Sequence, residues 1–466
     1  MPRQGAIVAV LAIAGLASSF MFTLVVPIQS KLPELLNASR EDTAWVVTAT
    51  LLAAAVSTPI AGRLGDMYGK RRIVLILLGL LIVGSVIAAL SPGIGGIIVG
   101  RALQGAVTGV VPLGISIMRD VLHEDRVDAA IALMSATLGV GGAVGMPVSA
   151  IITETSDWHV LFWMAAGLGA VVFVLVALVV PASVLRTAGR FDFAGAIGLA
   201  IGLTGVLLAV SRGNEWGWAS PATLSLGLGG LAVLLVWGWF ELRIREPLLD
   251  LRVAARPAVL LTNLASVAMG FSLFASNVSY PQMLELPASA GGFGLTLVQA
   301  SFIVMPAGLV MMVLSPFSGR LARTIGPRVL LIMGASALIL AYGYSLLWAS
   351  EVWHLLVANL LIGVGIGFGY AGMPMLIMRS VPQHETGASN GLNALFRSLG
   401  TSIAAAVVGA VLAALTVDVG GVAVPTPAAF QLSFALGLGA AGIALGVALF
   451  IPQRRDPHEA RPSMPR

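Results

Sequence analysis

Two segments combine glycine with charged residues in an order suited to tight turns and polar contacts between helices. The first, GRLGDMYGKRR, runs from Gly62 to Arg72, and the second, GRLARTIGPR, runs from Gly319 to Arg328. Glycine permits a tight turn and a close approach of two backbones. The Asp66 carboxylate can accept hydrogen bonds from backbone N–H groups at a helix N-terminus or from arginines.

The two segments are related by an internal duplication. Their glycines align in register, while Arg323 stands in the place of Asp66. A second echo, IMRDV at 117–121, recurs as IMRSV at 377–381, an offset of 260 residues that is close to the 257 residues between the first pair. Two echoes at nearly one offset predict two halves arranged as parallel repeats.

Transmembrane helices must position these segments. Of 466 residues, 58% are hydrophobic and only 10% are charged. This hydrophobic fraction exceeds what the core of a soluble protein requires. A helix needs roughly 20 apolar residues to cross a bilayer. Fourteen runs of that length are predicted spans: 6–28, 44–62, 73–91, 94–118, 128–152, 160–181, 193–211, 221–240, 257–281, 295–317, 328–349, 352–378, 387–415 and 429–451. We expect the first run to be a retained helix, not a cleaved signal peptide.

The basic residues predict the orientation of these spans. With a cytoplasmic N-terminus, 21 of the 26 Lys and Arg residues fall on the cytoplasmic side, as short cytoplasmic loops require. Seven of the nine tryptophans then lie near the outer face, where the headgroup layer favours them. We therefore predict a multi-pass protein of the plasma (cytoplasmic) membrane with both termini cytoplasmic.

The duplication predicts four segments. Residues 1–185 form an N-terminal six-helix lobe, 186–250 a linker with two extra transmembrane helices, 251–452 a C-terminal six-helix lobe and 453–466 a cytoplasmic tail. No polar stretch is long enough to fold as a separate soluble domain, so an appended enzyme is not expected. The Gly69-Lys70 pair lacks the first glycine and the hydroxyl of a phosphate loop, which argues against an ATP-driven pump.

Several other classes of site are not expected. The chain has no cysteine, and its five histidines are scattered without ligand-like spacing, so no disulfide, metal site or cofactor is predicted. Arginines in the loops account for the basic pI, and no clustered basic patch with interleaved aromatics suggests nucleic acid.

Further motifs carry a resemblance to a known family. GRALQG follows Val99 in the fourth span, GGAVGMP lies in the fifth, and the segment between the halves begins FDFAGAIG. With the first loop, these motifs resemble the major facilitator superfamily, specifically its fourteen-helix drug:proton antiporter branch. The resemblance covers nearly the whole chain. It implies an all-α polytopic membrane fold with 14 transmembrane helices, two six-helix lobes and two extra helices, and no enzymatic activity.

The resemblance also implies roles for residues. The loop residues at the family's signature positions would form a latch that holds the cytoplasmic side closed: Gly62, Asp66, Gly69, Lys70 and Arg71, with Gly319 and Arg323 in the second copy. Because Arg323 replaces Asp66, the second latch should be weaker or work differently. Gly141, Gly145 and Pro147 are similar to the exporter motif, although Met146 and the following VSA depart from it.

Charges inside the spans are candidates for proton coupling. Arg101 lies within an apolar span, where a fixed cation needs a partner or a wet cavity, and Gln104 at i+3 shares its face. A hydrogen bond to carbonyls of a neighbouring helix is the alternative. Arg397 is a second such cation, unless it extends to the interface. No acid lies mid-span, so the candidates are Glu154 and Glu34, either of which can also be a solvated loop acid.

Polar, aromatic and methionine side chains in the spans are candidates for a substrate cavity. They are Gln104 on the fourth span, Asn263, Asn277 and Tyr280 on the ninth, and Asn359, Tyr370 and Met373 on the twelfth. Packing between helices is the alternative for each.

We therefore expect a secondary active transporter that exports small amphipathic or lipophilic compounds, such as drugs and antibiotics, by alternating access in exchange for protons. Its partners would be a small-molecule substrate, protons and the lipid bilayer, and we expect a monomer. An exporter of an anionic metabolite or lipid is one alternative, because two arginines and no acid lie inside the spans. A non-transporting membrane sensor or scaffold is the other.

Overall fold

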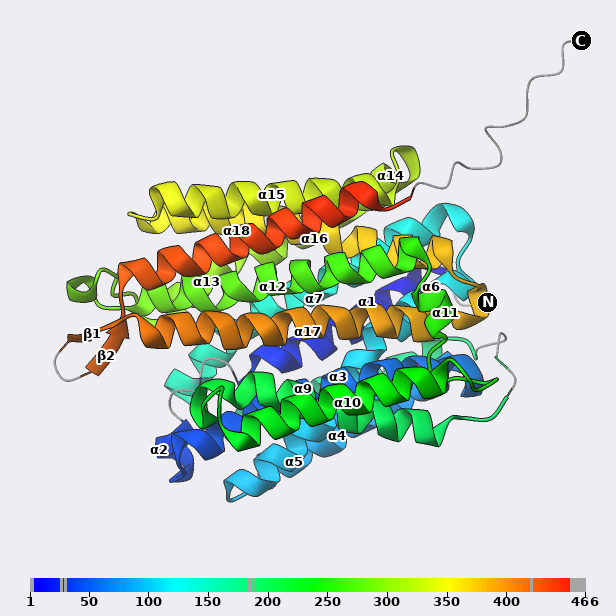
Figure 1. Ribbon diagram of the computed structural model, residues 1–466, viewed down its shortest axis with the longest axis horizontal. Helices are drawn as coiled ribbons and strands as arrows, with labels where there is room; N and C mark the ends of the chain where they lie inside the picture. The colour runs from blue at the N-terminus through cyan, green and yellow to red at the C-terminus, as the bar shows by residue number, and fades with distance from the viewer. Residues whose placement is uncertain are drawn as a thin grey trace, which may run out of the picture.

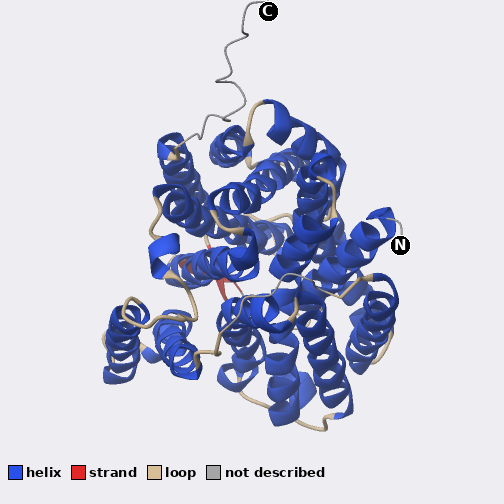
Figure 2. Cartoon of the chain, turned by 90° about the vertical axis from the view of Figure 1, so that its right-hand side faces the viewer, coloured by secondary structure: helices blue, strands red, loops and turns tan. Residues whose placement is uncertain are grey.

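The computed structural model is built almost entirely from helices (Figures 1 and 2). It describes residues 4–25, 28, 32–182, 187, 189–419 and 422–452. Fourteen helices within this part of the chain are long and apolar enough to cross a membrane. This confirms the predicted number of spans and the all-α fold class.

The helices before the insert form the first bundle. They are α1 (Gln4–Thr23), the short α2 (Leu32–Leu36), α3 (Arg40–Tyr68), α4 (Lys70–Leu90), α5 (Ile94–Gly105), α6 (Val110–Val121), α7 (Glu124–Thr155) and α8 (His159–Val179). A 3₁₀ turn, η1 (Ala106–Gly109), joins α5 and α6 into one span. The insert consists of α9 (Phe193–Trp216) and α10 (Pro221–Glu241).

The remaining helices form the second bundle. They are the short α11 (Leu251–Ala254), α12 (Pro257–Glu285), α13 (Leu297–Val304), α14 (Pro306–Thr324), α15 (Pro327–Trp348), α16 (Val352–Ser380), α17 (Thr386–Ala414) and α18 (Pro427–Phe450), with 3₁₀ turns η2 (Ala288–Ala290) and η3 (Gln383–Glu385). An antiparallel hairpin, β1 (Thr416–Val419) and β2 (Val422–Pro425), precedes α18 and pairs Thr416 with Pro425.

Local capping explains where several spans begin. The Ser39 side chain accepts a hydrogen bond from the backbone N–H of Asp42 at the start of α3, and Ser220 caps α10 in the same way. Thr296 and Gln299 form a capping box at the start of α13. Such side chains satisfy backbone N–H groups that have no partner within the helix.

The two bundles repeat the same helix pairs. In the first bundle α1 packs on α7, α3 on α5 and α4 on α8, and the corresponding pairs in the second are α12 on α17, α14 on α16 and α15 on α18. Across the bundles, α3 packs on α17 and α14 packs on α7. This pairing is what a duplicated chain would produce. The segment boundaries at 185 and 250 remain predictions, and the predicted tail at 453–466 lies outside the described residues.

The insert lies against the contact between the bundles. Leu199 and Leu203 of α9 are buried with Ala55 of α3 and Leu392 of α17. The second insert helix, α10, packs on α9 and leaves large apolar side chains exposed, among them Leu235. Figure 1 shows α10 in front of α9, on the viewer's side of the molecule. A lipid-facing surface accounts for this exposed apolar face.

The described chain begins and finishes at one end of the bundle. In Figure 1, α1 begins and α18 ends toward the right, whereas the β-hairpin lies at the left. Because α3 returns toward the end from which α1 starts, the Asp66 segment lies at the same end as the start of α1. That this end faces the cytoplasm remains a prediction.

Candidate functional site

Asp66 connects the two bundles. Its side chain, in the last turn of α3, is only 1% exposed. Its Oδ1 accepts a hydrogen bond from the backbone N–H of Gly387 at 3.2 Å, and its Oδ2 accepts one from Ala388 at 2.8 Å. These N–H groups belong to the first turn of α17, where they lack partners within the helix and the helix dipole is positive. A carboxylate of the first bundle therefore caps a helix of the second.

A buried lysine neutralises this carboxylate. Lys70 Nζ lies 3.8 Å from Asp66 Oδ1 and donates a hydrogen bond to Asp120 Oδ2 at 2.6 Å. It also donates to Thr386 Oγ1 at 3.5 Å, and the hydroxyls of Ser116 and Thr386 hydrogen-bond to each other. We call these five residues the Asp66 cluster. It joins α3, α4 and α6 to the start of α17.

Sequence reasoning missed Asp120. The residue stands inside the IMRDV motif that revealed the duplication, and the equivalent position in the second copy is Ser380. That difference is the signal that could have identified it, because only the first copy supplies a second carboxylate for Lys70.

Two glycines shape the first contact. A Cβ at Gly62 would lie 2.4 Å from the carbonyl oxygen of Gly387, so only glycine permits this approach of α3 and α17. Gly69 connects α3 to α4 with φ of 106°, which favours glycine. Arg71 donates instead to the carbonyl of Ala177 on α8, within the first bundle.

The second copy makes a different contact at the start of α7. A Cβ at Gly319 would lie 2.4 Å from Ala129 Cα, so the close approach is repeated. Arg323 donates to the carbonyl of Asp125 at 2.9 Å, and Arg379 donates to Asp128 Oδ2 at 2.9 Å. We call Arg323, Arg379, Asp125 and Asp128 the Arg323 contact. The Arg379 side chain is 47% exposed, so this contact is partly accessible to solvent.

Arg101 joins three helices of the first bundle. It is 1% exposed on α5 and donates through one guanidinium nitrogen to the carbonyl of Met21 at 3.0 Å and to Gln104 Oε1 at 3.1 Å. Gln104 in turn donates to Ser85 Oγ on α4 at 2.8 Å. Within the described chain, Arg101 forms no ion pair with a carboxylate. The arrangement matches the alternative of hydrogen bonding to a neighbouring carbonyl.

The other proposed charges lie in different settings. Arg397 on α17 is half-buried, and its guanidinium lies over the Tyr370 ring, 4.9 Å from the centroid, a cation–π distance. Among the residues described, Arg397 has no carboxylate partner. Glu34 on α2 and Glu154 near the end of α7 are exposed. Neither acid is therefore buried together with Arg101 or Arg397.

Two predicted cavity residues contact other helices of the second bundle. Asn263 Oδ1 accepts a hydrogen bond from Asn393 Nδ2 at 2.9 Å. Met373 Sδ lies 2.9 Å from the hydroxyl of Ser266. Asn263 and Met373 are 1% and 0% exposed. A role in binding substrate remains a prediction for both.

Of the three further cavity candidates, two hydrogen-bond to other helices of the second bundle. Tyr280 hydrogen-bonds to Ser345 at 2.9 Å, and Asn359 donates to the carbonyl of Val304 at 2.7 Å. Asn277 is half-buried. Tyr280 and Asn359 therefore hold helices of the second bundle together, which was the alternative considered for them.

The glycines of the predicted exporter motif face α1. A Cβ at Gly145 would lie 2.1 Å from Thr23 Oγ1, and one at Gly141 would lie 2.7 Å from the carbonyl oxygen of Leu16. Pro147 lies inside α7 and is buried. These residues allow α7 to pack closely on α1.

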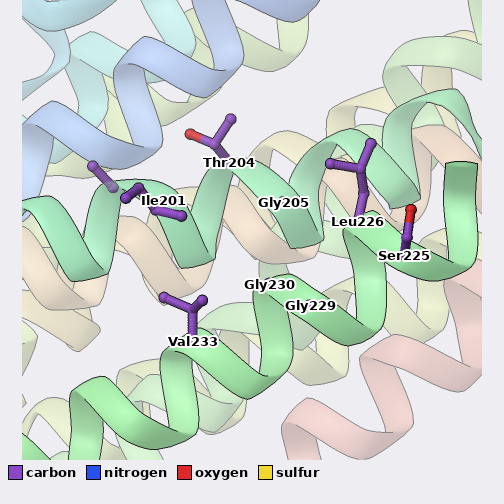
Figure 3. Close-up of a pocket in the computed structure, with 9 residues that line it drawn as sticks. Ile201, Thr204, Gly205, Ser225, Leu226, Gly229, Gly230 and Val233 are labelled. Carbon is purple, nitrogen blue, oxygen red and sulfur yellow. The ribbon is translucent and has the colours of Figure 1, made fainter.

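A groove of about 460 Å³ lies between the two insert helices (Figure 3). Small and apolar residues line it, among them Thr204 and Gly205 on α9 and Gly229, Gly230 and Val233 on α10. None of the predicted substrate residues lines this groove.

Comparisons with known proteins identify the family. The family model described as "Major Facilitator Superfamily" matches residues 11–189 and 184–405. The multidrug resistance protein Stp of Mycobacterium tuberculosis is 27% identical over 410 residues, which cover 86% of this chain and 74% of Stp. The lincomycin resistance protein LmrB of Listeria monocytogenes is 28% identical over 343 residues, covering 72% of this chain and 70% of LmrB.

A solved structure has the same fold. The human organic anion transporter MFSD10 (TETRAN) superposes with a TM-score of 0.68, covering 97% of this chain and all of the other at 14% sequence identity. Its likeness bears on the fold alone. With the family match over most of its length, its fourteen spans and its repeated helix pairs, this chain belongs to the major facilitator superfamily of membrane transporters and is similar to the multidrug-resistance members of that family.

Proposed function

We propose that this transporter exports small amphipathic or lipophilic compounds by alternating access, in exchange for protons. The Asp66 cluster carries the proposal. It joins one bundle to the other through a few polar contacts at one end of the molecule, and contacts of this kind can break and reform. The similarity to proteins named for multidrug and lincomycin resistance supports this class of substrate.

In this mechanism the Asp66 cluster closes the cytoplasmic end while the opposite end is open. Breaking the two hydrogen bonds to Gly387 and Ala388 frees α17 from α3, and the bundles tilt to expose the substrate to the cytoplasm. Charged hydrogen bonds contribute about 1.5–3 kcal/mol each. Two of them are therefore strong enough to hold one state and weak enough to be offset by substrate binding.

Export of an anionic metabolite or lipid is the second candidate. It is favoured by Arg397, a half-buried cation next to Tyr370 with no carboxylate partner in the described chain. A cation in this setting attracts an anionic group more readily than a lipophilic cation.

A proteoliposome assay distinguishes the candidates. Internal pH is followed while a panel of lipophilic cations and anions is added to purified transporter in vesicles. Proton movement with lipophilic cations, abolished in Asp66→Asn, supports proton-driven drug export. Movement of anions alone, altered by Arg397→Lys, supports the second candidate and contradicts the first. Vesicles that move neither class contradict both and leave the scaffold alternative.

A further inference from the structure

Two carboxyl groups meet where the insert helices come together. Asp192 immediately precedes α9, and Glu241 is the last residue of α10. Asp192 Oδ1 accepts a hydrogen bond from the backbone N–H of Gly195 at 2.8 Å, as a helix cap does. Glu241 Oε2 accepts one from Leu249 at 3.4 Å. Each carboxyl group thus has one oxygen with a backbone partner.

The other two oxygens face one point. A Cβ at Gly195 would lie 2.0 Å from Asp192 Oδ2 and 2.3 Å from Glu241 Oε1, so both oxygens surround the space that this glycine leaves empty. Both are buried and accept no hydrogen bond from the residues that the structure describes. The Glu241 side chain as a whole is 2% exposed.

Such an arrangement calls for one proton. Two ionised carboxylates offer only acceptors, and like charges this close repel strongly in a buried site. A single proton on either oxygen makes it a donor to the other and satisfies both. Carboxyl pairs that share one proton behave in this way.

No cation replaces that proton in the described chain. The charged side chains near this end on the elements around the pair are Arg63 and Asp66 on α3, Arg190 before α9, Arg397 on α17, and Arg243, Arg245, Glu246, Asp250 and Arg252 after α10. None of them forms an ion pair with Asp192 or Glu241. Arg243 instead stacks on Trp239 at 4.1 Å, and Arg252 donates to the carbonyl of Leu242.

The pair is connected to the contact between the bundles. Glu241 holds the backbone N–H of Leu249, and the buried side chains of Leu248 and Leu249 pack in the same cluster as Ala388 of α17. The backbone N–H of Ala388 is one of the two that donate to Asp66. A displacement of the Glu241 carboxyl group therefore acts on the segment that supports α17 where the Asp66 cluster holds it.

We propose that Asp192 and Glu241 form a one-proton site at the base of the insert, and that the bound proton holds Leu248 and Leu249 against the α3–α17 contact. Binding forms an O–H bond on one carboxyl oxygen and a hydrogen bond to the other, and release returns the proton to water. When both groups are ionised, their repulsion separates the ends of α9 and α10 and loosens the closed end. Its consequence for transport rests on the proton-driven export proposed above, but the site itself does not.

Infrared difference spectroscopy on the full-length protein tests the site directly. Spectra taken between about pH 5 and about pH 8 should contain a protonated-carboxyl C=O band that disappears in Glu241→Gln and in Asp192→Asn. Glu246→Gln is the matched control, because Glu246 is an exposed carboxylate in the same segment that accepts from the Arg190 backbone N–H. A band unchanged in both variants of the pair overturns the proposal.

Distances between spin labels test the link to the bundles. The chain has no cysteine, so Tyr68→Cys and Gln383→Cys, both at exposed positions, can be labelled without background. In the labelled protein with Asp192 and Glu241 intact, the fraction of molecules in which this end is closed should fall as the pH rises. Glu241→Gln supplies an amide donor in place of the proton and should keep that fraction high, at least about tenfold above its parent at high pH. An unaltered pH dependence overturns the link.

The two experiments separate this inference from the proposed function. If the carboxyl band is present but proteoliposomes move no protons, proton-driven export fails and the site stands. If vesicles exchange protons for drug while the band is insensitive to Glu241→Gln, export stands and the site fails. A Gly195→Ala variant adds a further check, since its Cβ would force the two oxygens apart and should abolish the band.

Discussion

The Asp66 cluster and the Arg323 contact occupy equivalent places in the two halves but differ in chemistry. Beside each lies a glycine where two helices approach closely, Gly62 against Gly387 and Gly319 against Ala129. Each also has a glycine turn with positive φ, 106° at Gly69 and 88° at Gly326. The shared backbone design places two helices equally close in both halves.

The side chains then make the two contacts unequal. In the first copy a buried carboxylate caps α17 and is balanced by a buried lysine. In the second, Arg323 donates to a backbone carbonyl and Arg379 pairs with Asp128 in partial contact with solvent. Buried charged hydrogen bonds are much stronger than exposed ion pairs. The duplication thus preserved the close approach of the helices in both halves. The polar contact of the first copy is the stronger of the two.

The largest effect is expected from Lys70→Met. Removing the cation leaves Asp66 and Asp120 buried without it, which costs roughly 3–5 kcal/mol. The thermal unfolding midpoint of the purified protein in detergent should fall sharply, with Arg323→Met, an exposed cation at the equivalent end, as the matched control. Equal unfolding midpoints for the two variants would contradict the proposal that the Asp66 cluster is stronger than the Arg323 contact.

Asp66→Asn should have the next largest effect, on transport more than on folding. The amide can accept from only one of the two N–H groups and presents a donor to the other. A loss of about 3 kcal/mol from the closed end corresponds to roughly a hundredfold change in its population. Initial transport rates in proteoliposomes should fall accordingly. Rates within a factor of two of the parent protein would refute the assignment.

Gly62→Ala and Gly319→Ala should resemble each other. Each Cβ would lie 2.4 Å from backbone atoms of the facing helix, and overpacking of this kind costs about 1–3 kcal/mol. We expect roughly a tenfold loss of transport for both variants, measured by drug accumulation in cells that express equal amounts of protein. A large loss in one copy alone would show that the backbone approach is also unequal.

Arg323→Ala should have the smallest effect. An exposed contact contributes about 0–1 kcal/mol, so transport should change by less than about fivefold. The residual effect should shrink further at high ionic strength, where exposed charges are screened. A salt titration of the transport rate checks this, and a hundredfold loss would reverse the ranking of the two copies.

The sequence predicted features that depend on local composition. Fourteen apolar runs gave the fourteen spans because a helix in lipid must satisfy its own backbone, and the aligned glycines marked both turns. The hairpin of β1 and β2 was not predicted, because it lies between two spans where hydropathy carries no signal.

The polar contacts were less predictable because they depend on which helix ends meet. Asp120 reaches Lys70 only when α6 packs beside α4. Glu241 and Asp192 stand at helix ends and gave no signal in the sequence, yet the folded insert buries Glu241 and one carboxyl oxygen of Asp192. Conversely, polar residues such as Asn359 lie mid-span and suggested a cavity, but a neighbouring carbonyl already occupies the Asn359 amide.

The central claim is that the Asp66 cluster, and not the Arg323 contact, holds the bundles together at this end. Spin labels at Tyr68→Cys and Gln383→Cys report on the first contact, and labels at the exposed Arg126→Cys and Arg320→Cys report on the second. Adding Asp66→Asn should shift the Tyr68–Gln383 distances to longer values, whereas Arg323→Ala should leave both pairs nearly unchanged. Unchanged Tyr68–Gln383 distances in Asp66→Asn, or an equal opening caused by Arg323→Ala, would contradict the account.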